Sequence, residues 1–276
     1  MGPSKLAYIA QGNDEATPLL LLHGGGASSW MWRPMKEYLR GTYFFIAPDL
    51  PGQGMSQDVP FVSMEAAADE IYDFIMDHIP DQTAHIVGLS EGAQVLVALL
   101  ARHPECVRSA LVSSALTQPL PGGKLLTPGL VRWSYKASIP PFRNNDAWIR
   151  LNMKYSAGIP DQYFEDFKKE FQRLTEDGFV NMMVANQNFR LPQGLEQTDC
   201  PVLALAGKKE YSAMQASAQE IAAACPQGQF AWIDLGAKAS LAQEHNWALT
   251  APEQFAAVVE AWIAGEPLPA PIFLAV

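Results

Sequence analysis

The stretch from Gly88 to Gly92 reads Gly-Leu-Ser-Glu-Gly and places a serine where it could act as a nucleophile. An apolar run of strand length precedes Ser90, and a run of good helix formers follows it. At such a sharp turn the serine Oγ is exposed, and Gly88 and Gly92 leave room where a Cβ atom would strike the neighbouring strand or helix. The backbone N–H of Glu91, at the start of the helix, would face negative charge that forms beside Ser90. A purely structural turn is the alternative interpretation.

A second glycine-rich loop follows another apolar run. Residues 18–22 read Pro-Leu-Leu-Leu-Leu, and His23-Gly24-Gly25-Gly26 comes directly after them. Three successive glycines let backbone N–H groups line a concave site that side chains would otherwise block, a geometry that suits an oxyanion hole. A plain flexible loop is the alternative.

Segments of strand length and helix length alternate on both sides of these loops. This alternation predicts right-handed crossovers and an α/β fold, in which helices flank a mostly parallel central sheet. Functional groups should then gather at the carboxyl ends of the strands, where Gly24, Asp49 and Ser90 all fall. The expected strands are residues 5–9, 18–22, 43–47, 85–89, 110–112, 201–207 and 230–235.

The pattern changes between residues 118 and 197. A linker of proline and glycine is expected at 118–123, and helical patterns follow at 146–157, 161–177 and 178–188, with no convincing strand. This segment carries a net charge of +2, whereas the rest of the chain carries −12. We interpret it as a helical cap inserted into a core domain formed by residues 1–117 and 198–276.

The cap also contains large apolar side chains that could form the roof of a substrate pocket. Trp133, Trp148, Met182 and Met183 are the candidates for this role. Packing within the cap is the alternative for each of them.

Composition bounds the class of protein. The chain has 276 residues, of which 49% are hydrophobic and 17% charged, which is typical of a globular protein. The net charge of −10 disfavours nucleic acid and anionic membrane surfaces as partners. No stretch reaches the roughly 18 apolar residues of a membrane span, and no apolar signal segment follows Met1. We therefore expect a soluble, cytoplasmic protein.

No motif indicates a metal or a cofactor, and we expect neither. Cys106, Cys200 and Cys225 are scattered, so we expect reduced thiols rather than a metal site. The glycines at 24–26 lack the spacing of a nucleotide-binding fingerprint. The expected partner is a small-molecule substrate, and the apolar tail at 267–276 is expected to pack on the body or against a second copy in a homodimer.

Taken together, these features resemble the α/β-hydrolase family over residues 5 to 264. In that family the nucleophile comes first in the chain, the acid follows, and the histidine is last. The resemblance implies that Ser90 is the nucleophile and that the backbone N–H groups of Gly25 and Glu91 form the oxyanion hole. The motifs that carry it are His23-Gly24-Gly25-Gly26, Asp49-Leu50-Pro51-Gly52-Gln53-Gly54-Met55-Ser56, Gly88-Leu89-Ser90-Glu91-Gly92 and the late His245.

The resemblance further implies that His245 is the base that takes the proton of Ser90. Of the five histidines it is the only one in a loop after the last expected strand, where the family carries its base. The family usually places this histidine closer to the glycine that corresponds to Gly236. The extra residues predict a long loop and a mobile histidine.

The acid departs from the family pattern. Residues 207–210 read Gly-Lys-Lys-Glu, where the family usually has Gly-x-x-Asp, so the resemblance implies that Glu210 is the acid. Glutamate is one methylene longer, and the backbone must compensate for its length. Glu244, Asp234 or no acid at all are the alternatives.

The sequence therefore predicts a carboxylesterase-like serine hydrolase that cleaves an ester, lactone or related acyl bond of a small, largely apolar substrate. Fold and triad do not choose between such bonds and the C–C bonds or amides that other family members cleave. A ligand-binding protein with little turnover stays open as an alternative, as does lyase or cofactor-free peroxidase-like chemistry at the same site.

Overall fold

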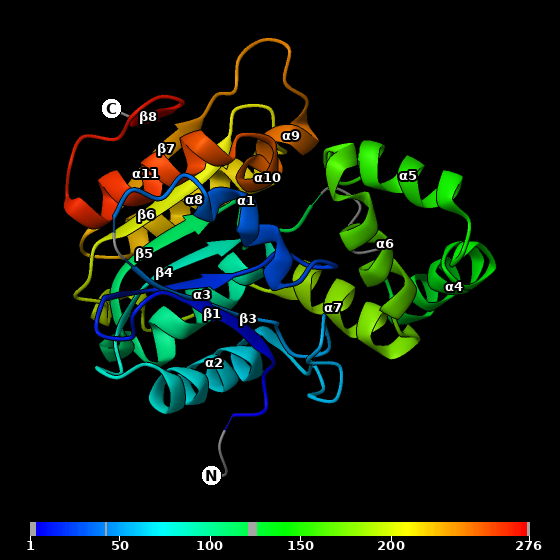
Figure 1. Ribbon diagram of the computed structural model, residues 1–276, viewed down its shortest axis with the longest axis horizontal. Helices are drawn as coiled ribbons and strands as arrows, with labels where there is room; N and C mark the ends of the chain where they lie inside the picture. The colour runs from blue at the N-terminus through cyan, green and yellow to red at the C-terminus, as the bar shows by residue number, and fades with distance from the viewer. Residues whose placement is uncertain (1–3, 42, 121–125, 275–276) are drawn as a thin grey trace.

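The computed structural model describes residues 4–41, 43–120 and 126–274, so residues 121–123 of the predicted linker lie outside it. Its described strands form one sheet in the order β1-β3-β2-β4-β5-β6-β7-β8 (Figure 1). All neighbours are parallel except the two edge pairs, β1 with β3 and β7 with β8. The strands are β1 Tyr8–Gln11, β2 Thr17–Leu22, β3 Tyr43–Pro48, β4 Ala84–Leu89, β5 Val107–Ser113, β6 Val202–Gly207, β7 Gly228–Ile233 and β8 Ile272–Leu274.

The predicted mostly parallel sheet is therefore confirmed, with one addition at its edge. The strand expected at 230–235 is not the last one, because part of the apolar tail forms β8 and pairs antiparallel with β7. All three cysteines are free and buried.

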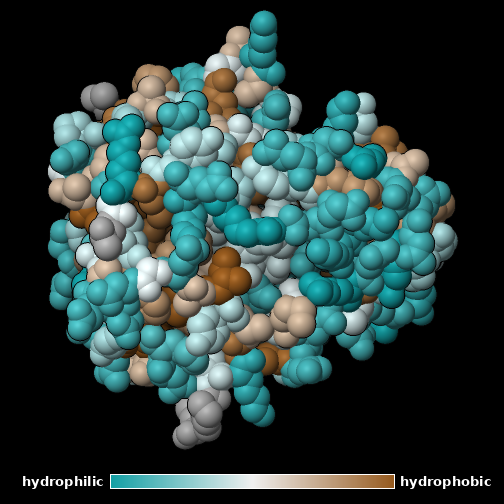
Figure 2. All heavy atoms as spheres, viewed as in Figure 1, coloured by the Kyte–Doolittle hydropathy of each residue, from teal (hydrophilic) through white to brown (hydrophobic). Residues whose placement is uncertain are grey.

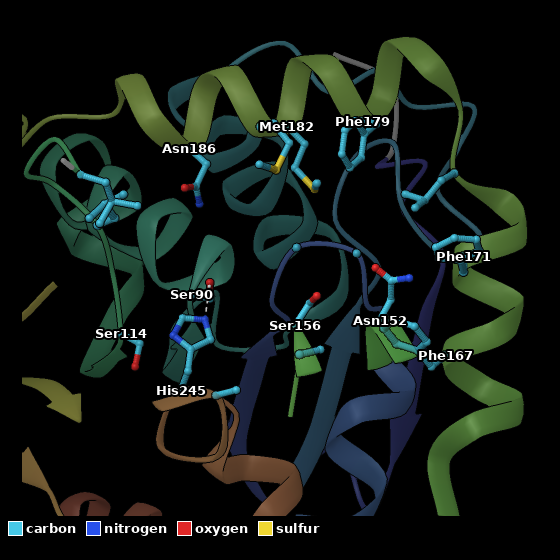
Figure 3. A pocket seen from close by; sticks show the side chains of 18 of the residues that line it. Ser90, Ser114, Asn152, Ser156, Phe167, Phe171, Phe179, Met182, Asn186 and His245 are labelled. Atoms are coloured by element: carbon cyan, nitrogen blue, oxygen red, sulfur yellow. Dashed lines mark hydrogen bonds between the residues drawn. The ribbon is translucent and has the colours of Figure 1, made fainter. Parts of the chain in front are cut away.

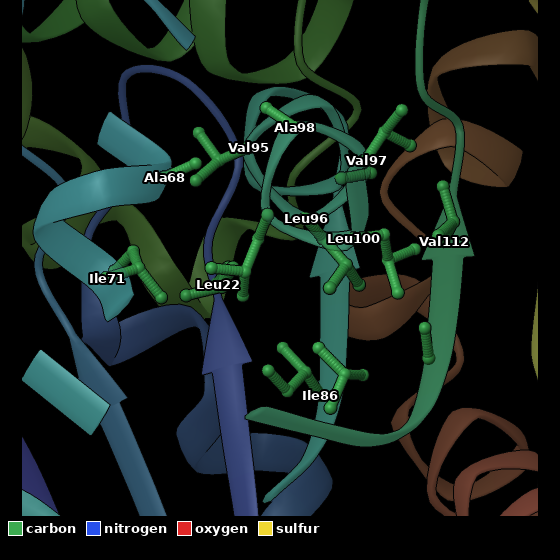
Figure 4. Packing of buried hydrophobic residues seen from close by; sticks show 14 of the residues in the cluster. Leu22, Ala68, Ile71, Ile86, Val95, Leu96, Val97, Ala98, Leu100 and Val112 are labelled. Carbon is green, nitrogen blue, oxygen red and sulfur yellow. The ribbon is translucent and has the colours of Figure 1, made fainter. Parts of the chain in front are cut away.

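Helices cover both faces of the sheet, as expected for strands that are apolar throughout. In β2, Leu20 and Leu22 pack into the cluster beneath α2 and α3, whereas Leu19 and Leu21 face the cluster on the other side with Trp32. Figure 4 shows the α3 side of the sheet. The helices are α1 Arg33–Lys36, α2 Met64–His78, α3 Glu91–Arg102, α4 Pro128–Ser138, α5 Asp146–Tyr155, α6 Phe164–Arg173, α7 Glu176–Asn188, α8 Ser212–Ala224, α9 Leu241–His245, α10 Trp247–Thr250 and α11 Pro252–Ala264.

The segment between β5 and β6 contains α4 to α7 and lies beside the sheet in Figure 1. Three of these helices match the expected patterns, with shifted ends, whereas α4 was not expected. Thr175 caps α7, since its side chain accepts a hydrogen bond from the N–H of Gly178. On the face shown in Figure 2, the surface over these helices is largely hydrophilic.

Buried and partly buried polar contacts join this helical segment to the rest of the molecule. Gln94 of α3 and Asn186 of α7 exchange hydrogen bonds, because Asn186 Nδ2 donates to Gln94 Oε1 at 2.9 Å and Gln94 Nε2 donates to the Asn186 carbonyl at 3.1 Å. Ser28 Oγ donates to Glu170 of α6 at 3.0 Å. These contacts fix α6 and α7 over the carboxyl ends of the strands.

Among the described residues, no helix combines the length and the apolar composition that a membrane crossing requires.

The turn from β4 into α3 depends on close backbone approaches. A Cβ atom on Gly92 would lie 2.5 Å from the carbonyl carbon of Leu22 and 2.6 Å from the carbonyl oxygen of His23. A Cβ atom on Gly88 would lie 2.5 Å from the Gly92 carbonyl oxygen. Gly92 is therefore required by the packing of α3 against the end of β2, and Gly88 by the packing of β4 against the first turn of α3, as the sequence predicted.

Replacing Gly92 by alanine should lower the stability of the fold. The added methyl group would overlap main-chain atoms that cannot rotate away, and overpacking of this kind costs about 1–3 kcal/mol. Gly129→Ala is the matched control, because a Cβ atom there meets nothing within 4 Å and alanine favours a helix. Chemical denaturation should show a lower midpoint for Gly92→Ala and an unchanged or higher one for Gly129→Ala; equal midpoints would contradict the packing described.

Candidate active site

Ser90 sits at the turn between β4 and α3 in a strained backbone conformation. Its φ of 56° and ψ of −114° lie outside the regions that a residue with a side chain normally adopts. Such strain costs on the order of 1–3 kcal/mol and is usually found at functional sites. The conformation turns the side chain toward a cavity, where Ser90 is one of the lining residues.

His245 reaches Ser90 from the end of α9. Its Nε2 lies 3.0 Å from Ser90 Oγ, and its Nδ1 lies 2.6 Å from Oε1 of Glu210. The expected long and mobile loop is instead partly helical, because Ser240 and Gln243 form a capping box that starts α9. The extra residues before His245 are thus used to build a short helix that carries the imidazole.

Glu210 lies just after β6 with a side chain that is fully buried. Its Oε2 accepts hydrogen bonds from the Gly207 N–H at 2.7 Å and from Ser114 Oγ at 3.1 Å, and its Oε1 faces His245. An ionised carboxylate only accepts hydrogen bonds. His245 Nδ1 therefore carries the imidazole proton, which leaves Nε2 free to accept the proton of Ser90.

The two other carboxylates considered from the sequence contact different groups. Glu244 is buried, and its Oε2 accepts a hydrogen bond from the Lys209 N–H at 2.7 Å. Asp234 pairs with Lys208 Nζ at 2.9 Å near the surface. Of the three candidate acids, only Glu210 is hydrogen-bonded to the ring of His245 in the part of the chain that the structure describes.

The glycine loop after β2 lies next to Ser90. Gly25 and Gly26 line the same cavity as the serine. The Gly26 N–H donates to Gln53 Oε1 at 2.7 Å, whereas the N–H groups of Gly25 and Glu91 have no acceptor among the described residues. Two unengaged backbone donors beside Ser90 are the arrangement that an oxyanion hole requires.

His23 anchors the start of this loop. Its Nε2 accepts a hydrogen bond from the Leu50 N–H at 2.8 Å, so its Nδ1 donates to the Gly24 carbonyl at 2.9 Å. Burial lowers the pKa of His23. The imidazole is therefore neutral at pH 7 and acts as a structural link between two loops.

The cavity above Ser90 has a volume of about 620 Å³ and is largely apolar. In Figure 3, Phe179, Met182 and Asn186 project from α7 over Ser90 and His245, and Phe167 and Phe171 close another side. Met182 and Met183 line the cavity, as the sequence suggested.

The other two predicted pocket residues do not line this cavity, and the prediction for them is wrong. Trp133 is 67% exposed, because Val131 and Tyr135 are the buried residues of α4 and residue 133 lies on the opposite side of that helix. Trp148 stacks on Phe142 with ring centroids 4.5 Å apart. Both tryptophans thus belong to the surface or the packing of the helical segment.

A sequence profile described as the alpha/beta hydrolase fold matches residues 17–238. The chain belongs to the α/β-hydrolase fold family. Among its relatives, a protein named carboxylesterase YbfK from Bacillus subtilis is 28% identical over 220 residues, which cover 75% of this chain and 68% of the relative. A pimeloyl-[acyl-carrier protein] methyl ester esterase from Citrobacter koseri is 28% identical over 172 residues, which cover 62% of this chain and 56% of that protein.

Solved structures of α/β hydrolases have the same fold. The enol-lactonase from Burkholderia xenovorans LB400 superimposes with a TM-score of 0.73 at 17% identity, covering 94% of this chain and 96% of the lactonase. A thermophilic esterase from Thermogutta terrifontis gives a TM-score of 0.69 at 20% identity, covering 94% of this chain and 93% of the esterase. At this identity the likeness supports the fold of the hydrolase core and its helical segment, and no particular substrate.

Some residues of this α/β-hydrolase site were not found from the sequence. Ser114, which donates to Glu210, also has a positive φ of 59° and lines the cavity. Its place directly after the β5 strand, at the carboxyl edge, was the available signal. On α7, Phe179 and Asn186 were also missed, although they line the cavity at helical spacing from the predicted Met182 and Met183.

The hydrogen bond between His245 and Glu210 can be observed directly. Replacing Glu210 by glutamine removes the anionic acceptor, and we expect the low-field proton NMR resonance of the His245 Nδ1–H to disappear. Glu244→Gln, which alters a buried glutamate one residue from His245, should leave that resonance in place. Loss of the resonance in Glu244→Gln and its persistence in Glu210→Gln would contradict the assignment.

Proposed function

We propose that this α/β hydrolase is a serine esterase that cleaves an ester, a lactone or a related acyl bond of a small, largely apolar substrate. The observation that carries the proposal is the continuous line of hydrogen bonds from Glu210 through His245 to Ser90. A hydroxyl group needs a base within hydrogen-bonding distance to become a nucleophile near neutral pH. Relatives named carboxylesterase and methyl ester esterase support the same activity.

In the proposed mechanism, Ser90 Oγ attacks the carbonyl carbon while His245 Nε2 takes the hydroxyl proton. The carbonyl oxygen becomes an oxyanion that receives hydrogen bonds from the N–H groups of Gly25 and Glu91. The intermediate collapses to an acyl-enzyme as His245 returns the proton to the leaving alcohol. Water then attacks the acyl-enzyme by the same steps, with His245 as its base, and releases the acid.

Glu210 has a supporting role in this mechanism. It fixes the tautomer and the orientation of the imidazole, and its negative charge stabilises the imidazolium that forms during attack. Gly207 and Ser114 hold its second oxygen, so the added methylene of glutamate is accommodated without loss of the contact with His245.

The helical segment 118–197 acts as the cap in this proposal. The segment supplies most of the apolar side chains around the cavity, among them two phenylalanines of α6 and Phe179, Met182 and Met183 of α7, and these would contact the acyl chain. A cavity of about 620 Å³ falls in the usual range for small-molecule sites. The polar side chains of Asn152 and Asn186 are among the lining groups that could orient a carbonyl or hydroxyl of the substrate.

Nitrophenyl esters with acyl chains of increasing length test the proposal. We expect kcat/KM to rise by up to about fourfold per added CH₂ group until the cavity is filled, because each buried CH₂ contributes about 0.8 kcal/mol. Phe179→Ala, which enlarges the cavity, should move the optimum to longer chains, whereas Trp133→Ala should not, because Trp133 lies outside the cavity. Ser90→Ala should reduce kcat on the order of 10⁶-fold.

Folded protein that hydrolyses none of these esters, or hydrolyses them equally well after Ser90→Ala, would contradict the proposal. The alternative hypothesis, a ligand-binding protein with little turnover, would then be favoured.

A further inference from the structure

The side chain of Glu91 is buried against the glycine loop. Glu91 is 1% exposed. A Cβ atom added to Gly25 would lie 3.1 Å from Met182 Sδ and 3.6 Å from the carboxyl carbon of Glu91. It would lie closer still to Glu91 Oε2. Gly25 is not one of the described glycines with a positive φ, so its backbone conformation does not itself call for glycine. A side chain at residue 25 would therefore have to displace the Glu91 carboxyl group and Met182.

The two oxygens of Glu91 have unequal surroundings. Oε1 accepts a hydrogen bond from Gln53 Nε2 at 3.1 Å, and the other end of the Gln53 amide accepts one from the Gly26 N–H at 2.7 Å. Oε2 is buried without a hydrogen-bond partner among the described residues. The nearby thioether of Met182 is only a weak acceptor and offers no proton. A single amide thus connects Glu91 to the loop, and no donor in the described part of the chain compensates a negative charge on Oε2.

These surroundings favour a neutral carboxylic acid. Burial raises the pKa of Glu91 to about 8, although the hydrogen bond from Gln53 opposes the shift. The titratable side chains on neighbouring elements are His23, Asp49, Glu170, Arg173 and His245, and each has its own hydrogen-bond partners other than Glu91. Arg173, which lines a small cavity with Gln53, pairs with Glu170 at 3.3 Å. No cationic side chain among them is positioned to hold Glu91 ionised at pH 7.

We propose that Glu91 is a positioning residue for the oxyanion hole, which keeps Gly25 and Gly26 in place as a neutral acid and opposes the reaction once it is ionised. The inference rests on the proposed function. In the neutral form, Glu91 packs on Gly25 and holds Gly26 through Gln53. In the ionised form, an uncompensated charge lies beside the Gly25 backbone, where it repels the negative charge that forms on the substrate oxygen.

The pH profile of hydrolysis tests this role. We expect kcat/KM of the wild-type enzyme to fall by about tenfold from about pH 7 to about pH 9, as a single group loses its proton. Glu91→Gln keeps the shape and cannot ionise, so its kcat/KM, relative to its own value at pH 7, should stay level over this range. Glu170→Gln is the matched control, because burial raises the pKa of Glu170 as well, and it should retain the wild-type fall.

A second variant should shift the alkaline fall in kcat/KM to higher pH. Gln53→Met removes the donor that favours ionised Glu91, so the fall in kcat/KM should begin at higher pH than in the wild type. Identical alkaline limbs in the wild type, Glu91→Gln and Gln53→Met would overturn the inference.

Thermal stability provides a readout that does not need turnover. Between the ordinary pKa of a glutamate and the raised value in the fold, the folded protein binds a proton that the unfolded chain does not. The stabilisation is therefore full at low pH and is lost as pH rises through about 8. The melting temperature of the wild type should fall relative to Glu91→Gln from about pH 5 to about pH 8.

The two readouts separate the inference from the proposed function. If no ester is hydrolysed, the proposed function fails, and the melting temperatures still decide the state of Glu91. A difference between wild type and Glu91→Gln that does not change with pH would show that Glu91 is not held neutral and would overturn the inference. A pH-dependent difference in stability together with equal kinetic profiles would overturn its role in the oxyanion hole.

Discussion

The site depends on how closely α3 approaches the end of β2. Gly92 brings the first turn of the helix against the main chain of Leu22 and His23, a distance that no side chain on residue 92 would allow. This approach sets Ser90 in its strained conformation directly beside the glycine loop. The proposed nucleophile and the candidate oxyanion donors therefore follow two neighbouring parallel strands, and the packing of the sheet itself fixes the distance between them.

The remaining parts of the line of hydrogen bonds come from distant regions of the chain. Glu210 follows β6 and His245 ends α9, and they meet because parallel strands place their carboxyl ends at one edge. The carboxylate is held at both oxygens, and the short helix α9 replaces what would otherwise be a flexible loop. Each group in the line has its orientation fixed by the next, so little reorganisation is needed before proton transfer.

Most of the fold could be predicted from the sequence because its signals are local. The apolar run in β2 reads as a strand buried on both faces, and the two glycines around Ser90 indicate a crowded turn. The tail strand β8 could not be predicted, because a three-residue edge strand forms only through its pairing with β7. Likewise α4 has an exposed Trp133 on a helix with few buried residues, so its apolar pattern is weak.

The sequence placed the candidate site residues Ser90, His245 and Glu210 where the family pattern fixes their position in the chain, and the structure brings these three side chains together. The choice between Glu210 and Glu244 needed three-dimensional information, because both side chains are buried. Only the structure shows that Glu210 contacts the His245 ring, whereas Glu244 contacts the Lys209 N–H. The pocket was predicted less well, since which side of a helix faces the cavity depends on how the helical segment docks. The Glu91 side chain was overlooked because only its backbone N–H has a place in the family pattern.

We propose that the hydrogen bonds from Glu210 through His245 to Ser90 activate the serine. Intact-mass analysis after exposure to a fluorophosphonate tests it most directly, because this reagent modifies a serine that a nearby base and oxyanion donors activate. We expect one adduct per chain, absent in Ser90→Ala and formed much more slowly in His245→Ala. Folded protein that gains no adduct, or that gains the same adduct after Ser90→Ala, would contradict it.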